Sequence, residues 1–135
     1  MADRFSKQER SRVMGTVKSA NTTPEIHVRK FLHRSGFRYN ICRKDLPGKP
    51  DIVLPKYRTA IFVNGCFWHQ HPGCKKSARP VTNIEFWDNK LNKNVDRDAR
   101  SVLALNELGW KVIVIWECKS KNPSKLSELA EDIRS

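Results

Sequence analysis

A cluster of cysteine and histidine residues is the part of this sequence best suited to hold a metal ion. Two thiols and two imidazoles fall within nine positions, at Cys66, His69, His71 and Cys74. Thiolates combined with imidazole are typical zinc ligands, and a closed tetrahedral site needs a further ligand from elsewhere, for which Cys118 is the candidate. The sequence therefore predicts a structural zinc site. The spacing leaves open which imidazole is the ligand, and separate buried thiols are the alternative.

Two carboxylates occupy positions that are unusual for a solvated surface. Asp51 follows Pro50 and begins an apolar segment, as in nucleases that cut phosphodiesters with Mg²⁺. The second half of that motif, an acid and a lysine on the next strand, is missing here, and His69, Asp98 and Glu25 are the groups available to replace it. Asp98 lies on the predicted buried stripe of a helix, so it needs a cation, a metal-bound water or an imidazole beside it. A structural ion pair is the alternative for Asp98.

The charge of the chain favours a polyanionic partner. The 135 residues include 26 Lys and Arg against 14 Asp and Glu, which gives a formal net charge of +12. The excess is concentrated in residues 1–44 and again in residues 75–100. Such clustering is typical of nucleic-acid-binding proteins and favours that reading over a merely solubilising surface.

Aromatic rings lie in the same regions as the metal cluster and the second basic segment. Phe67 and Trp68 are inside the Cys/His cluster, and Phe86 and Trp87 begin the basic helix. We expect Phe86 to fill the core, which is the commonest role of a large ring. Beside a surface that binds DNA, rings on a metal-tethered loop can instead wedge between base pairs and unstack them.

The elements that position these groups follow from hydrophobic periodicity and breaking residues. Helices are predicted over residues 6–18, 24–35 and 124–134, with a long helix from a capping box at 82–85 to Gly109. Strands are predicted over residues 37–41, 51–54, 59–63 and 110–116. Cys42, in the first strand, is expected to lie in the core. A helix followed by a buried strand suggests a parallel crossover, so we expect an α/β fold in which helices flank a mixed sheet.

The length of the chain fits one ordinary domain. We expect residues 1–22 to form a basic helical arm and residues 23–135 to form the main domain. The longest apolar run, residues 112–116, is too short to cross a bilayer, and the N-terminal region lacks a signal-peptide core. We therefore expect a cytoplasmic protein with no membrane partner.

Taken together, these segments resemble the very short patch repair (Vsr) endonucleases, which nick DNA beside a T·G mismatch left by deamination of 5-methylcytosine. The resemblance extends nearly end to end and is carried by LPGKPD at 46–51, GCFWHQH at 65–71 with Cys74, EFW at 85–87, KNVDRD at 93–98 and LGWKVIVIWEC at 108–118. It implies a type II restriction-endonuclease-like fold and makes residues 23–135 an endonuclease domain.

The resemblance also implies roles for individual residues. The zinc ligands would be Cys66, His71, Cys74 and Cys118, which makes His69 the catalytic imidazole. Catalytic Mg²⁺ would be held by Asp51 and the backbone carbonyl of Val63, with Glu25 holding metal-bound water and Asp98 orienting His69. The residues that contact DNA would be Met14 in the arm, Phe67, Trp68, Trp87, Lys93 and Asn94.

Two positions depart from the family pattern. The family has Thr where this chain has Val63, which matters little if only the Val63 carbonyl is used. The family has His where this chain has Asn64, which can hydrogen-bond but cannot titrate, so acid–base work would fall to His69. The expected function is a Mg²⁺-dependent endonuclease that nicks one strand 5′ to the T of a T·G mismatch. We expect a monomer acting on double-stranded DNA ahead of other repair proteins. The alternatives are a zinc protein that binds mismatched or bent DNA without cutting it, and a restriction-type enzyme that cuts both strands.

Overall fold

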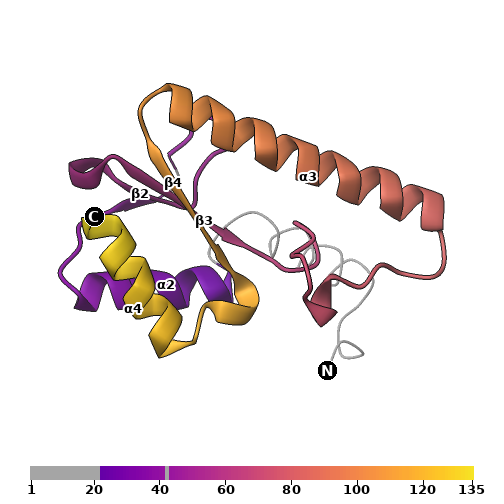
Figure 1. The fold of residues 1–135 in the computed structure, drawn as a ribbon, viewed down its shortest axis with the longest axis horizontal. Helices are drawn as coiled ribbons and strands as arrows, with labels where there is room; N and C mark the ends of the chain where they lie inside the picture. The colour runs from indigo at the N-terminus through magenta and orange to yellow at the C-terminus, as the bar shows by residue number, and fades with distance from the viewer. Residues whose placement is uncertain (1–21, 42) are drawn as a thin grey trace, which may run out of the picture.

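The computed structural model describes residues 22–41 and 43–135, which form a mixed sheet with helices on both faces (Figure 1). The predicted N-terminal helix, Met14 and Cys42 lie outside those residues. The helices are α2 (Thr23–Arg34), α3 (Ile84–Glu107) and α4 (Pro123–Arg134). The strands are β1 (Asn40–Ile41), β2 (Ile52–Leu54), β3 (Thr59–Asn64) and β4 (Lys111–Trp116). Most predicted elements are therefore present, with ends displaced by a few residues.

The order and direction of the strands bring three chain segments to one edge of the sheet. The order is β1-β2-β3-β4, with β1 and β3 antiparallel to β2 and with β4 parallel to β3. The parallel pair is connected through α3, which confirms the predicted crossover. Because β3 and β4 end in register, at Asn64 and Trp116, the segments that follow them leave the sheet side by side. The start of β2, at Ile52, lies at the same edge because β2 runs the opposite way.

Two separate apolar clusters hold the helices to the sheet. On one face, Val28 and Leu32 of α2 and Leu126, Leu129 and Ile133 of α4 pack against buried residues of β2, β3 and β4. On the other face the buried cluster is smaller and comprises Leu46, Val53, Ala60, Leu105 and Trp110. Only the C-terminal part of α3 contributes to it, through Leu105. The sheet therefore fixes α2, α4 and one end of α3.

The N-terminal half of α3 extends beyond the sheet, and this corrects several predictions (Figure 1). Phe86, expected in the core, is 59% exposed, and Val95, expected on the buried stripe, is 40% exposed. Asp98 is only partly buried, whereas Asn94 takes the buried position. Periodicity indicated which face of α3 is apolar, and Leu91 on that face is fully buried, but beyond the sheet the remaining cover is too small to bury Val95 as well. Among the described residues, no helix is both long enough and apolar enough to span a membrane.

Two further local expectations are wrong. The predicted capping box before α3 does not form, because Asn83 is the N-cap residue, has a positive φ of 52°, and makes no side-chain capping hydrogen bond. The strand β4, expected to be buried, has Ile115 as its one buried residue. Within the described residues β4 pairs on one side only, with β3, which leaves its other side uncovered by the sheet.

A tight turn before β2 docks against α3. Gly48 has a φ of +74°, and a Cβ atom placed there would lie 2.5 Å from the Cβ of Ser101 and 3.3 Å from the Phe62 ring. Lys49, the next residue, also has a positive φ, of 50°. The turn leads directly into Asp51, so its close approach to α3 fixes how β2 begins.

We expect Gly48→Ala to destabilise the protein more than Gly36→Ala. Both glycines have a positive φ, which costs an alanine about 1–2 kcal/mol, but only Gly48 lies against a neighbour, adding about 1–3 kcal/mol of overpacking. Urea unfolding of both variants measures the difference. Adding Ser101→Gly should recover part of the loss in the Gly48 variant. Equal destabilisation by the two alanine substitutions would contradict the close packing of this turn.

Candidate active site and metal centre

Asp51 is held at the edge of the sheet by the backbone of β3. Its Oδ2 atom accepts a hydrogen bond from the Val63 N–H at 2.7 Å, and its own N–H donates to the Ile61 carbonyl at 3.0 Å. Burial raises the pKa of Asp51 to about 6, against the lowering effect of the Val63 N–H; Glu25 raises it further and His69 lowers it. These electrostatic effects show that Glu25 and His69 lie close to Asp51. A buried carboxyl of this kind is well suited to bind a cation.

Glu25 reaches the same region from the first turn of α2. Thr22 caps that helix by accepting the Glu25 N–H at 3.3 Å, and Pro24 occupies the first turn, where it costs no hydrogen bond. The Glu25 side chain is buried, and its Oε2 atom lies 3.4 Å from Nη2 of Arg29, one turn along the helix. Two carboxylates therefore approach one another at the sheet edge, with Arg29 beside Glu25.

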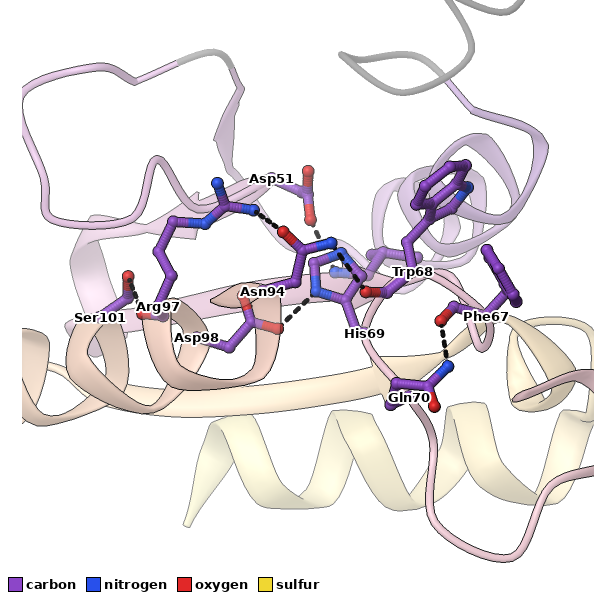
Figure 2. A network of polar contacts seen from close by, with 10 residues as sticks. Asp51, Phe67, Trp68, His69, Gln70, Asn94, Arg97, Asp98 and Ser101 are labelled. Carbon is purple, nitrogen blue, oxygen red and sulfur yellow. Dashed lines mark hydrogen bonds and ion pairs between the residues drawn. The ribbon is translucent and has the colours of Figure 1, made fainter. Parts of the chain in front are cut away.

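His69 and Asp98 form a hydrogen-bonded pair between the loop after β3 and the middle of α3. The His69 Nδ1 atom lies 2.5 Å from Oδ2 of Asp98 (Figure 2). Asp98 therefore has the imidazole partner that its position in the sequence required. The two side chains are 27% and 33% exposed, so the pair is open to solvent on one side. Figure 2 shows Asp51 in the same region as this pair, so the three side chains face a common site.

Asn94 anchors the loop that carries His69. Its Nδ2 atom donates to the Trp68 carbonyl at 3.2 Å, and its Oδ1 atom accepts from Nη2 of Arg97 at 3.0 Å (Figure 2). In this structure the buried Asn94 amide thus binds the protein's own loop, while Lys93 beside it is exposed on α3. Asn64 is buried at the end of β3, directly before this loop.

The four residues that the family resemblance gave as zinc ligands converge in the structure. The ligand atoms of Cys66, His71, Cys74 and Cys118 all lie within 4.8 Å of one another. The His71 Nδ1 atom is 3.7 Å from Sγ of Cys66 and 3.4 Å from Sγ of Cys118. A tetrahedral zinc with ordinary bond lengths separates sulfur and nitrogen ligands by about 3.6 Å, so the geometry fits this ion. His69 bonds Asp98 instead and is not part of this cluster.

The surroundings of the cluster hold it at the end of β4. The His71 ring stacks on Trp116, with centroids 4.3 Å apart, and Oε1 of Glu117 accepts the Cys66 N–H at 3.2 Å. Burial raises the pKa of Cys66 to about 12, and the neighbouring thiols reinforce that shift. A thiolate at Cys66 therefore requires a cation, which is what a zinc ion supplies.

The aromatic residues of the loop and of α3 contact one another in one cluster and do not fill the core separately. Phe67 contacts Trp68 at 5.0 Å and Trp87 at 5.6 Å between ring centroids, and Trp68 lies 5.9 Å from Trp87. Phe86 packs edge-on against Trp87 while remaining exposed. The cluster is partly open to solvent, and its loop members Phe67 and Trp68 directly precede His69 (Figure 2).

Sequence reasoning missed two residues of this region, Gln70 and Arg79. They connect the loop backbone to α3 through side-chain hydrogen bonds. Both lie in a segment without periodicity, and their partners are up to 13 positions away, so no sequence pattern marked them.

Comparison with known proteins identifies relatives along the chain. The family model described as DNA mismatch endonuclease Vsr matches residues 2–76. The chain is 45% identical to the type II nicking enzyme V.NmeAIP of Neisseria meningitidis serogroup A, covering 99% of this chain and 98% of that protein. It is 40% identical to the DNA mismatch endonuclease Vsr of Escherichia coli K12, covering 96% of this chain and 83% of that protein.

A solved structure supports the architecture. The catalytic domain of the homing endonuclease I-Bth0305I superposes with a TM-score of 0.57 at 22% identity, covering 84% of this chain and 94% of that domain. This likeness concerns the fold alone. Together with the four-stranded mixed sheet and its flanking helices, it confirms the expected restriction-endonuclease-like fold.

The raised pKa of Asp51 predicts a pH-dependent stability in Mg²⁺-free buffer. Because the folded carboxyl keeps its proton up to about pH 6 and the unfolded one loses it near pH 3.8, stability should fall as the pH rises between these values, by up to about 3 kcal/mol. The variant Asp51→Asn lacks this loss, so it should gain stability relative to wild type between pH 4 and pH 7 in urea unfolding.

Asp45→Asn is a control for which the opposite pH dependence of stability is expected. Hydrogen bonding to Arg43 lowers the pKa of Asp45, so that pair stabilises the fold at neutral pH and the effect disappears on acidification. A stability difference between Asp51→Asn and wild type that stays constant from pH 4 to pH 7 would contradict the buried, proton-retaining Asp51 described above.

Proposed function

Because the chain belongs to the family of the DNA mismatch endonuclease Vsr, and is thus a DNA endonuclease, we propose that it nicks one strand of duplex DNA 5′ to the T of a T·G mismatch. Such mismatches arise when 5-methylcytosine is deaminated. The observation that carries the proposal is the convergence of Asp51, the His69–Asp98 pair and the aromatic cluster on one side of the sheet edge.

We propose that Mg²⁺ binds at Asp51. Carboxylate and carbonyl oxygens are its preferred protein ligands, and Asp51 lies beside buried Glu25 and against the backbone of Val63. Asp51 and the Val63 carbonyl would hold the ion, and Glu25 would hold a water molecule next to it. When bound, the ion supplies positive charge that stabilises the scissile phosphate and the leaving 3′ oxygen.

His69 would act as the base in this site. A carboxylate at Nδ1 holds the neutral imidazole in the form that carries its proton on that nitrogen, so Nε2 is left to accept a proton. Asp98 then stabilises the imidazolium that results when His69 takes a proton from the attacking water. Asn64 cannot share this role because its amide does not titrate.

The aromatic cluster would supply mismatch preference. Inserting rings into a duplex costs a few kcal/mol per unstacked step, and a T·G pair lowers that cost relative to a matched pair. Phe67, Trp68 and Trp87 lie together with part of their surface open to solvent, as a wedge requires. The basic side chains of the chain would hold the DNA backbone, with Met14 and Lys93 among the residues that contact DNA.

We propose that the Cys/His cluster holds one structural zinc. Three ligands come from the loop after β3 and Cys118 follows β4, so the ion would tie the loop to the sheet. His69 lies between two of these ligands in sequence and would be positioned by them. A monomer suffices for this function because one strand is cut once, and further repair proteins would act on the nick.

We expect the wild-type protein to nick only the T-containing strand of a T·G duplex, and only with Mg²⁺. Asp51→Asn should lower the single-turnover rate by at least about 10³-fold, and His69→Ala by about 10²–10⁴-fold. Denaturing gels with each strand labelled separately measure both effects. Asp45→Asn, an exposed aspartate outside the site, should retain the wild-type rate.

The same assay distinguishes the alternatives. Cleavage of both strands of a matched duplex would indicate a restriction-type enzyme. Binding of the mismatched duplex without any nick would indicate a non-catalytic DNA-binding protein. Equal nicking by wild type and Asp51→Asn would remove Asp51 from the metal site.

Loss of a zinc ligand should remove both the metal and part of the stability. We expect Cys74→Ser to bind less than one-tenth of the zinc of wild type and to unfold at least about 5 °C lower, because the loop is no longer tied to β4. Elemental analysis and thermal unfolding measure these changes. Cys42→Ser, outside the proposed ligand set, should keep full zinc content, and zinc retention by Cys74→Ser would contradict the site.

A further inference from the structure

The loop that carries Phe67, Trp68 and His69 is attached to the rest of the protein at two places, and the contacts at each place are of a different kind. One end is the Cys/His cluster beside β4. The other end lies against the overhanging half of α3, where Leu91 is buried but belongs to neither of the two apolar clusters that hold the helices to the sheet. The ring contacts of Phe67 and Trp68 with Trp87 cross this junction. Polar side chains around Arg79 cross it as well.

Arg79 uses its guanidinium to hold three side chains at once. Its Nε donates to Oε1 of Gln70 at 2.8 Å, its Nη1 to Oδ1 of Asp88 at 2.9 Å, and its Nη2 to Oδ1 of Asn92 at 2.9 Å. Asp88 follows Trp87 directly, and Asn92 lies one turn further along the same helix. The planar fork of arginine fixes these partners in a single geometry, which an ammonium group cannot do.

Gln70 transmits this geometry to the backbone of the aromatic loop. Its Nε2 atom donates to the Phe67 carbonyl at 2.6 Å (Figure 2) and also to the Ser77 carbonyl at 3.1 Å. The amide orientation is determined by its neighbours, because Arg79 can only donate and the two carbonyls can only accept. Gln70 has a positive φ of 53°, a conformation that a residue other than glycine adopts only when its contacts hold it there.

The contacts form one continuous chain from the Phe67 carbonyl through Gln70 and Arg79 to α3 beside Trp87. We call this chain the Arg79 bridge. It sets the distance between the two parts of the aromatic cluster, the loop rings and Trp87. The catalytic pair has contacts of its own, because His69 bonds Asp98 and the Trp68 carbonyl accepts from Asn94.

We propose that Arg79, acting through Gln70, is a positioning residue that pre-orders the aromatic wedge and thereby sets the preference for mismatched over matched DNA. The inference rests on the proposed mismatch function. Rings held in one arrangement before DNA arrives need no ordering on insertion, so binding of a duplex that accepts the wedge is strengthened selectively. A matched duplex that refuses the wedge gains nothing from this pre-ordering.

The test compares Arg79→Gln, Arg79→Lys and Gln70→Ala with the matched control Arg43→Gln, which breaks another exposed arginine–carboxylate pair. We expect the first three variants to raise KM for a T·G duplex about tenfold while kcat stays within about threefold of wild type. Affinity for a matched duplex should be unchanged in Gln70→Ala. Arg43→Gln should preserve the wild-type mismatch preference.

Arg79→Lys separates geometry from charge. If Arg79 served only as a positive charge near DNA, lysine would restore wild-type behaviour, and that result would overturn the proposal. An unchanged KM for the T·G duplex in Arg79→Gln would also overturn it while leaving the nicking function intact. A fall in kcat with no change in KM would place Arg79 in support of the catalytic pair and would likewise contradict the proposal.

A second measurement applies even if the wild-type protein fails to nick. In the free zinc-loaded protein, the indole N–H resonances of Trp68 and Trp87 should shift or broaden in Arg79→Gln, while those of Trp110 and Trp116 remain as in wild type. Unchanged Trp68 and Trp87 resonances would overturn the Arg79 bridge itself. Changed resonances in a protein that does not nick would support the bridge and refute the proposed function.

Discussion

The parallel pairing of β3 with β4 is the constraint on which the rest of the site depends. It makes both strands end at one edge of the sheet, so the loop with Cys66, His71 and Cys74 emerges beside the segment with Cys118. The antiparallel β2 begins at the same edge, which allows Asp51 to bond the Val63 N–H. If β4 were antiparallel to β3 with the same neighbours, Cys118 would leave from the opposite edge and the ligand set could not close.

A second scaffold, α3, complements the sheet. One end of it is fixed by Leu105 in the core, and its middle presents Asp98 to His69 and Asn94 to the Trp68 carbonyl. The turn at Gly48 packs against the same helix at Ser101, so the position of the segment leading to Asp51 is also fixed relative to α3. The groups assigned to proton transfer and to metal binding are thus aligned through a shared helix, although they come from distant parts of the sequence.

Much of this arrangement could be predicted from the sequence where the signal is local chemistry. The spacing of thiols and imidazoles predicted a metal site, and a carboxylate on an apolar helix face predicted a polar partner for Asp98. Exposure of Phe86 and Val95 could not be predicted, because periodicity identifies an apolar face but does not show where the sheet beneath it ends. Gln70 and Arg79 gave no signal, because their partners are chosen by the path of an irregular loop.

The overhang of α3 has a consequence for how the molecule responds to heat. The two apolar clusters support the sheet and the C-terminal end of the helix, whereas its overhanging half and the adjoining loop rely on buried Leu91, half-buried ring contacts and exposed polar contacts of small individual worth. Segments of that kind open locally at a lower free energy than the core. The overhanging half of α3 and the adjoining loop should therefore open at lower temperatures than the sheet, and under the proposed function warming would weaken the preference for mismatched DNA before it unfolded the protein.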